Sequence, residues 1–296
     1  MAARRTRGWR LSTFMLLAPW LLTWVAFFAF PIFWSLYISF TPFSLLNPRF
    51  EWIGLSNYIF LIQSPYFWRT LSNTVVFTLG VVPTTLCLSL AAALMVRGPV
   101  PARGFIQASF FLPGVVSVVV MAIIFKHIFA PNGLMDGLLW LAGFTLPSPP
   151  WLLNPRWAII AVMVMSVWTS FGFYMLLFVA ALRSIPEDLY DAAAIDGASP
   201  WATFWHVDLP QLRPTILLVL ALTTIHSLQV FSEIFVMTEG GPLGTTTTSV
   251  YYLYTLAFED FHMGKASALS YMMFVIIMAV VSVQMWLLRL NRGTNE

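Results

Sequence analysis

The sequence predicts an all-α membrane protein that crosses the bilayer six times. Of its 296 residues, 59% are hydrophobic and only 9% are charged, and six long stretches contain no Asp, Glu, Lys or Arg. A soluble domain averages roughly 25% charged residues, whereas a helix needs roughly 20 apolar residues to cross the hydrocarbon core. The net charge of +3 is small and scattered, which argues against a nucleic-acid partner. Lipid is therefore the expected surrounding.

The uncharged stretches place the six spans. The first covers residues 11–48, where Pro42 and Pro48 predict that the helix ends near Phe40. Arginines precede this stretch, as in a signal peptide, but the apolar run is too long for one, so we expect an uncleaved span. The other five stretches lie between Arg69 and Arg97, Arg103 and Lys126, Arg156 and Arg183, Arg213 and Glu233, and Lys265 and Arg289.

The basic residues predict the orientation of these spans. Inside connections of membrane proteins carry an excess of Lys and Arg. A cytoplasmic N-terminus places ten of the 15 basic residues inside and leaves outside only Arg49, Arg69, Lys126, Arg156 and Lys265. We therefore expect a multi-pass protein of the cell (inner) membrane with both termini cytoplasmic.

The motifs of an enzyme are missing from the sequence. Gly264-Lys265 is followed by Ala266 and lacks the upstream spacing of a phosphate loop, so no ATP site is expected in this chain. The four histidines are far apart and show no metal-ligand spacing. A lipid-modifying membrane enzyme would need clustered His, Asp or Cys near one interface, and the sequence shows no such cluster. We expect no catalytic residue, no metal and no cofactor in this chain.

An ion-coupled sugar transporter is a further alternative. Such a protein usually needs an ionisable group at membrane depth. Lys126 and Glu233 fall at the edges of the predicted spans, which weighs against this mechanism. Backbone carbonyls alone can bind Na⁺, however, so the alternative stays open at this point.

The inside loop at 183–214 carries the most specific signal. Ser184 and Glu187 form a predicted capping box, and Gly197 predicts the end of a first short helix. Ser199 followed by Pro200 predicts the start of a second helix, and Pro210 and Pro214 predict its end. A single such helix would fit an amphipathic element on the lipid headgroups. Two capped helices with a glycine between them favour a rigid, protruding docking element.

This loop resembles the EAA loop of the permease subunits of ATP-binding-cassette importers. The family pattern is Glu-Ala-Ala, three residues, Gly, nine residues, Ile, one residue and Leu-Pro. It falls here on Asp191-Ala192-Ala193, Gly197, Val207 and Leu209-Pro210, with Asp for Glu and Val for Ile. A second stretch from Val230 to Pro242, continuing through Tyr251 to Ser270, is similar to the carbohydrate branch of the family, which often has Asp where Ser232 stands. The likeness covers Thr70 to Leu288.

The resemblance implies the transmembrane domain of a type I importer. Residues 1–69 would hold the N-terminal cytoplasmic tail, the first span and an outside loop, residues 70–288 the core with its coupling loop, and residues 289–296 a cytoplasmic tail. The implied partners are a second homologous permease, two ATP-binding subunits that carry ATP and Mg, an extracytoplasmic sugar-binding protein and membrane lipid. The implied ATPase-coupling residues are Glu187, Asp191, Ala192, Ala193, Asp196, Gly197 and Pro210.

Seven residues of spans four and five are candidates for the substrate pathway. Sugars bind to aromatic faces combined with neutral hydrogen-bonding groups, and the candidates are Trp168, Thr169, Phe173, Tyr174, Thr224, Gln229 and Ser232. Each has an ordinary alternative, because Ser and Thr often join membrane helices and aromatic residues often face lipid. The absence of basic residues at span centres favours a neutral mono- or oligosaccharide over glycerol 3-phosphate or a related polyol phosphate. A non-transporting scaffold is the last alternative.

Overall fold

The computed structural model describes residues 15–98, 101–145 and 149–290, and within these ranges it is helical and contains no β-strand. Contacts divide the chain into two compact units, each described here by itself. The N-terminal unit comprises residues 1–64 and 253–273, and the core unit comprises residues 65–252 and 274–296. Five described helices are long and apolar enough to cross a membrane, over Met15–Ser39, Pro65–Met95, Ala158–Arg183, Pro200–Leu228 and Met263–Leu287.

The first span of the N-terminal unit ends where the prolines predict. It includes a π-helical stretch, η1 (Val25–Ala29), and then α2 (Phe30–Ser39), which is capped by Phe40. Almost none of this span is buried, and its large apolar side chains are exposed. A helix that is apolar all round and uncovered by protein is suited to contact lipid.

Buried polar contacts hold the loop after α2 against the N-terminal unit's next helix. The amide of Asn57 in α3 (Ser56–Gln63) donates to the carbonyl oxygens of Ser39 and Thr41, each at 2.8 Å. The unit also contains η4 (Thr255–Glu259) and the start of α14 (Met263–Leu290), where a Cβ on Gly264 would lie 2.3 Å from the oxygen of Thr41. Only glycine allows the two backbones to approach so closely.

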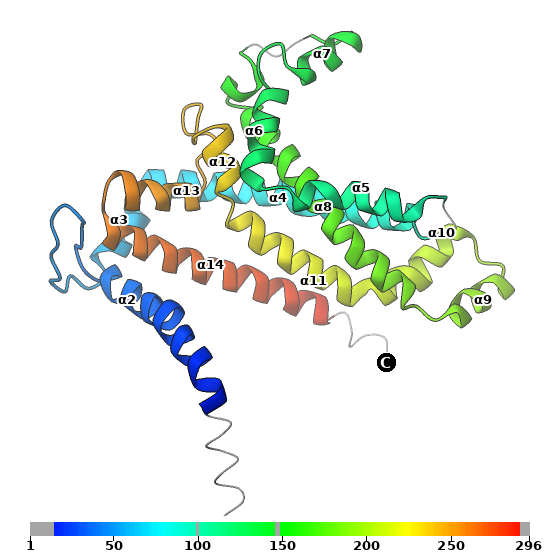
Figure 1. Cartoon of the computed structure of the whole chain (residues 1–296), viewed down its shortest axis with the longest axis horizontal. Coiled ribbons are helices and arrows are strands. Elements are labelled where there is room, and N and C mark those ends of the chain that lie inside the picture. Colours follow the sequence, from blue (N-terminus) through cyan, green and yellow to red (C-terminus); the bar gives the residue numbers. More distant parts are fainter. Residues whose placement is uncertain (1–14, 99–100, 146–148, 291–296) are drawn as a thin grey trace, which may run out of the picture. The chain divides into compact units, whose positions relative to one another are not determined.

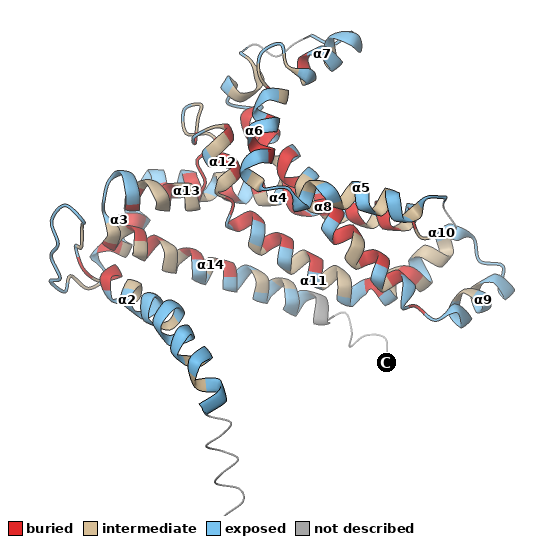
Figure 2. Cartoon of the chain, viewed as in Figure 1, coloured by how far each residue is buried: buried red, intermediate tan, exposed pale blue. Residues whose placement is uncertain are grey.

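The core unit is organised around α4 (Pro65–Met95), α8 (Ala158–Arg183) and α11 (Leu209–Leu228). Both α8 and α11 pack against α4 and also contact each other (Figure 1). Buried side chains follow α8 along its whole length (Figure 2) and gather in two apolar clusters. The first contains Phe77, Met165 and Ile234, and the second contains Ala93, Phe178 and Leu212.

The predicted third span is present as a bent pair of helices rather than as one continuous helix. It consists of α5 (Arg103–Val115) and α6 (Val118–Ile128), which meet at 96° (Figure 1). Pro113 has no N–H to continue the helical hydrogen bonds, and Val116 and Ser117 are extended, with ψ of 141° and 130°. Packing completes the break, because α5 lies mainly on α8 whereas α6 lies mainly on α12 (Ser232–Met237).

Three further elements of the core unit lie in loops that the sequence places outside. They are α7 (Leu134–Leu141), η2 (Trp151–Leu153) and α13 (Ser249–Tyr254), whose last two residues fall in the N-terminal unit. The loop before α13 is held by side chains: the amide of Asn73 donates to the oxygens of Gly244 and Thr247, at 3.0 and 2.9 Å. The predicted linear division at 69/70 stays a prediction, whereas the two compact units are discontinuous in sequence.

Candidate functional site

The first helix of the 183–214 loop is α9 (Glu187–Ile195), and its start differs from the predicted capping box. The N-cap is Pro186, which has no side-chain cap. The Ser184 hydroxyl instead donates to the oxygen of Ala181 at 2.8 Å, at the end of α8. Proline disfavours helical backbone in the residue before it, and Ile185 is anchored in the second apolar cluster. The box was therefore a wrong prediction: Ser184 ends one helix rather than beginning the next.

The end of α9 confirms the predicted glycine stop. Gly197 has φ +69°, and its N–H donates to the oxygen of Ala194 at 3.1 Å while the N–H of Ala198 donates to Ala193 at 2.9 Å. This pair of bonds is the Schellman motif, which places glycine in left-handed backbone just past a helix. A side chain at this position meets no atom within 4 Å, so backbone conformation alone requires glycine.

The second helix of the loop begins as predicted but does not end at its prolines. The Ser199 hydroxyl accepts the N–H of Ala202 at 3.2 Å, and Pro200 is the first residue of α10 (Pro200–Thr203). The helix then continues through the π-helical turn η3 (Phe204–Asp208) into α11, past Pro210 and Pro214. The wider π turn gives Pro210 room against the preceding carbonyls, so the prediction that these prolines stop the helix was wrong.

The predicted coupling residues lie together on and around α9. Glu187, Asp191, Ala192, Asp196 and Gly197 are exposed, Ala193 is half-buried, and Pro210 is half-buried at the start of α11. Figure 2 shows α9 largely exposed. Two large apolar side chains beside them are also exposed, Ile195 by 86% and Trp201 by 70%. We call residues 187–206 the knob; its exposed apolar surface is typical of a site that a protein partner covers.

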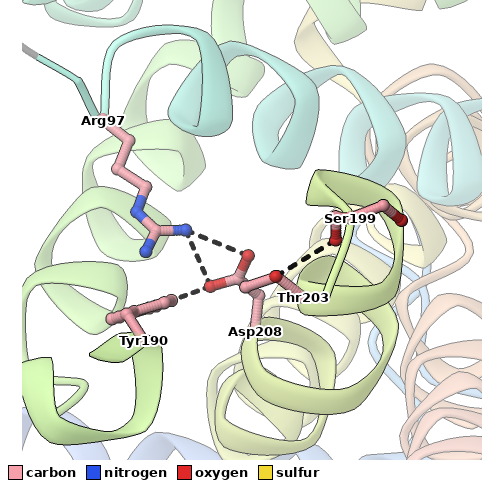
Figure 3. A network of polar contacts seen from close by, with 5 residues as sticks. All are labelled: Arg97, Tyr190, Ser199, Thr203 and Asp208. Atoms are coloured by element: carbon pink, nitrogen blue, oxygen red, sulfur yellow. Dashed lines mark hydrogen bonds and ion pairs between the residues drawn. The ribbon is translucent and has the colours of Figure 1, made fainter. Parts of the chain in front are cut away.

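A partly buried ion pair joins Asp208, just after the knob, to Arg97, just after α4. Asp208 in η3 is 3% exposed and accepts two hydrogen bonds from Arg97, at 2.8 and 3.0 Å. The Tyr190 hydroxyl of α9 donates to the same carboxylate at 2.6 Å, and the Arg97 guanidinium lies 4.1 Å from the centre of the Tyr190 ring. Figure 3 shows Arg97 and Tyr190 converging on Asp208. We call these three residues the clamp.

The clamp fixes the protonation of its tyrosine. Burial, and then the hydrogen bond to Asp208, raise the pKa of Tyr190 above its ordinary value, so the hydroxyl keeps its proton and remains a donor. Tyr190 and Val207 also pack against the second apolar cluster of α4, α8 and α11. The knob is therefore packed against the same apolar cluster as three helices of the core unit.

Sequence reasoning did not find the clamp. Asp208 lies inside the quoted motif, between Val207 and Leu209, and Arg97 ends the second uncharged stretch. A carboxylate next to two apolar residues was the available signal for Asp208. Asp208 and Arg97 are 111 residues apart in the sequence, so their pairing could be recognised only from the fold.

Three of the seven pathway candidates line one pocket of the core unit. Thr169, Phe173 and Tyr174 of α8 lie around a cavity of about 180 Å³, next to the break between α5 and α6. His226 of α11 and Glu233 of α12 complete its lining. We call this cavity the α8–α12 pocket.

The other four candidates lie elsewhere. Trp168 lines a separate apolar groove of about 630 Å³ with residues of α4 and α5. Thr224 is fully buried and accepts a hydrogen bond from the amide of Gln284 in α14 at 3.0 Å. This contact joins α11 to α14, as Ser and Thr often do between membrane helices. Gln229 caps α11 and is exposed, and Ser232 is the half-buried first residue of α12. A substrate role for these residues stays a prediction.

Known proteins similar in sequence or structure match nearly the whole chain. A multiple sugar-binding transport system permease of Streptococcus mutans, MsmF, is 33% identical over 93% of this chain and 92% of its own length. A lactose transport system permease of Rhizobium radiobacter, LacF, is 32% identical over 93% of both chains. The crystal structure of a bacterial ABC transporter that imports the acidic polysaccharide alginate matches with a TM-score of 0.82 at 25% identity, over 98% of each chain.

The family model for binding-protein-dependent transport system inner membrane components matches residues 85–292. This range includes the knob, Asp208 and Arg97 of the clamp, and every residue of the α8–α12 pocket. The match confirms the all-α membrane fold and the importer family that the loop motif indicated. The chain is therefore a member of the binding-protein-dependent transport system inner membrane component family.

Proposed function

We propose that this chain is one of two permease subunits of a sugar importer. The family is binding-protein-dependent, and the relatives named above are sugar permeases. The α8–α12 pocket, with an aromatic face and hydroxyl groups, supports a sugar as the cargo. A neutral mono- or oligosaccharide is the proposed substrate.

The clamped knob is the observation that carries this proposal. In the proposed importer, ATP and Mg bind to two partner ATPase subunits, and the knob is their docking element. The exposed surface of α9 is the proposed contact with the partner, whereas Tyr190 and Asp208 hold the other side of the knob to Arg97, just after α4. Closure of the ATPases would then tilt α4, α8 and α11 together and shift the two-state equilibrium of the pathway.

The remaining partners follow from the same proposal. A second permease subunit completes the pathway, and an extracytoplasmic sugar-binding protein delivers the cargo. The knob and both termini face the cytoplasm, as the distribution of basic residues favours. Exposed apolar side chains along the spans suit contact with lipid or with the partner permease.

The test is the substitution Gly197→Val in the complete importer, reconstituted in vesicles. A β-branched residue at φ +69° disfavours the Schellman end of α9. We expect normal insertion into the membrane, while ATPase activity stimulated by the binding protein and sugar uptake fall together.

Gly143→Val is the matched control. Gly143 ends α7 with φ +78°, the same pair of backbone bonds and no atom within 4 Å of an added Cβ. It carries the same backbone strain on the other predicted side of the membrane, so coupling should survive. Normal stimulation and uptake by a stably inserted Gly197→Val importer would refute the role of the knob.

A further inference from the structure

The α8–α12 pocket contains a buried acid that has no partner among the described residues. Glu233 is 4% exposed, and within the part of the chain that the structure describes its carboxylate has no hydrogen bond and no ion pair. Burial of an ionisable side chain is costly unless it is hydrogen-bonded or paired. Because Glu233 lines a cavity, a molecule in that cavity is positioned to supply the missing donors.

The position of Glu233 is fixed by its neighbours. Ile234 and Met237, on the same short helix, are buried in the first apolar cluster against α6 and α8. The backbone just before this helix is held as well, because the Thr248 hydroxyl donates to the oxygen of Val230 at 3.1 Å. A side chain on an element held in this way is preorganised for binding.

Two further polar side chains of the pocket are available to a ligand. Neither the Tyr174 hydroxyl nor the His226 ring makes a hydrogen bond within the described ranges. Both groups can donate and accept, whereas an ionised carboxylate only accepts. Phe173 adds a half-exposed ring, 5.4 Å from the ring of Tyr174 and nearly perpendicular to it.

We propose that Glu233, His226 and Tyr174 hold a sugar ring through its hydroxyl groups, and that Glu233 selects neutral over acidic sugars. This inference rests on the proposed function of sugar transport. A cavity of about 180 Å³ corresponds to about six waters of roughly 30 Å³ each, the scale of one sugar ring. The lining contains no Lys or Arg among the described residues, so the charge of Glu233 repels an anionic sugar.

The experiment measures uptake by the complete importer in ATP-loaded vesicles, at equal amounts of assembled complex. The probes are radiolabelled maltose, lactose, trehalose and raffinose as neutral sugars, and digalacturonate as an acidic one. Binding of the same probes to the solubilised importer, without the binding protein, separates the pocket from the delivery step. The variants are Glu233→Ala, which removes the acceptors, and Glu233→Gln, which keeps the shape and removes the charge. Glu259→Gln, at an exposed acid of the N-terminal unit, is the matched control.

We expect Glu233→Ala to weaken binding of the transported neutral sugar by roughly tenfold or more, as for lost hydrogen bonds to a charged group. Glu233→Gln should raise the binding of digalacturonate relative to that sugar, and Glu259→Gln should change neither value. Unchanged affinities in both Glu233 variants, with normal neutral-sugar uptake by the wild-type importer, would overturn this inference and leave the proposed function intact. Absence of ATP-driven uptake of every probe by the wild-type importer would overturn both.

Discussion

At the scale of single residues, Asp208 joins the knob to the membrane helices. It is almost fully buried and accepts hydrogen bonds from Arg97 and Tyr190. Asp208→Asn keeps the shape of the side chain but leaves the Arg97 charge without a counter-ion. We expect the substitution to lower the free energy of unfolding by about 1–3 kcal/mol, measured as a lower midpoint of thermal unfolding in detergent.

Asp188→Asn is the control for this substitution. Asp188 lies in the first turn of α9 and is exposed, so the same chemical change should leave the midpoint nearly unchanged. Equal midpoints for both variants and the wild type would show that the clamp contributes nothing to stability.

Tyr190 makes the stability contributed by the clamp depend on pH in the alkaline range. Its pKa in the folded protein is raised above the ordinary value of 10.0, so the folded state holds the proton more tightly than the unfolded state. The corresponding stabilisation is complete below pH 10 and is lost as the pH rises through the raised pKa. We expect the unfolding midpoint of the wild type to fall more steeply above pH 10 than that of Tyr190→Phe. Parallel curves would contradict the raised pKa of Tyr190 in the folded protein.

At the scale of elements, the contact between α5 and α8 depends on Gly172. A Cβ at this position would lie 1.8 Å from the backbone oxygen of Phe110, and a backbone atom of a packed helix cannot move aside cheaply. Gly172→Ala should therefore separate the two helices and lower the free energy of unfolding by at least about 1–3 kcal/mol. The measurement is the thermal unfolding midpoint, together with the yield of folded protein.

Gly104→Ala is the matched control in α5. Gly104 lies in the helix that packs against Gly172 of α8, and an added Cβ on Gly104 would meet no atom within 4 Å. Alanine in an open helical position stabilises the folded protein by roughly 0.5–1 kcal/mol relative to glycine. The thermal unfolding midpoint of Gly104→Ala should therefore be unchanged or higher. A Gly172→Ala protein as stable as the Gly104→Ala protein would contradict the close packing of α5 on α8.

The helix ends and breaks also show which structural features sequence patterns predict and which they do not. Gly197 and Ser199 act through bonds to residues within five positions, so local rules located the end of the first loop helix and the start of the second. Pro210 misled the same rules because the π turn before it is a backbone adjustment that no residue type announces. The break after Val115 depends on α6 packing against α12, more than 100 residues later. Local chemistry is visible in sequence, whereas long-range packing is not.

At the scale of the whole molecule, the bent pair α5–α6 decides the number of crossings. The structure has five single membrane-length helices among its described residues, and this pair is either a sixth, broken span or a re-entrant loop. With six crossings both termini lie on one side of the membrane, and with five they lie on opposite sides. Contacts along α8 favour six. Ile106 of α5 packs in the second cluster with Leu182, near one end of α8, whereas Phe129 just after α6 packs with Ile159, near the other end.

Because the pair follows α8 from end to end, we expect it to cross the membrane despite its bend. Single cysteines test this in a Cys87→Ser background, since Cys87 is free and exposed. Gly98→Cys lies before the pair and Ala142→Cys beyond it, and both positions are exposed. A membrane-impermeant maleimide should label Ala142→Cys in intact spheroplasts and should reach Gly98→Cys only after lysis. Labelling of both cysteines before lysis, or of neither, would make the pair a re-entrant loop. That result would also place the two termini on opposite sides of the membrane.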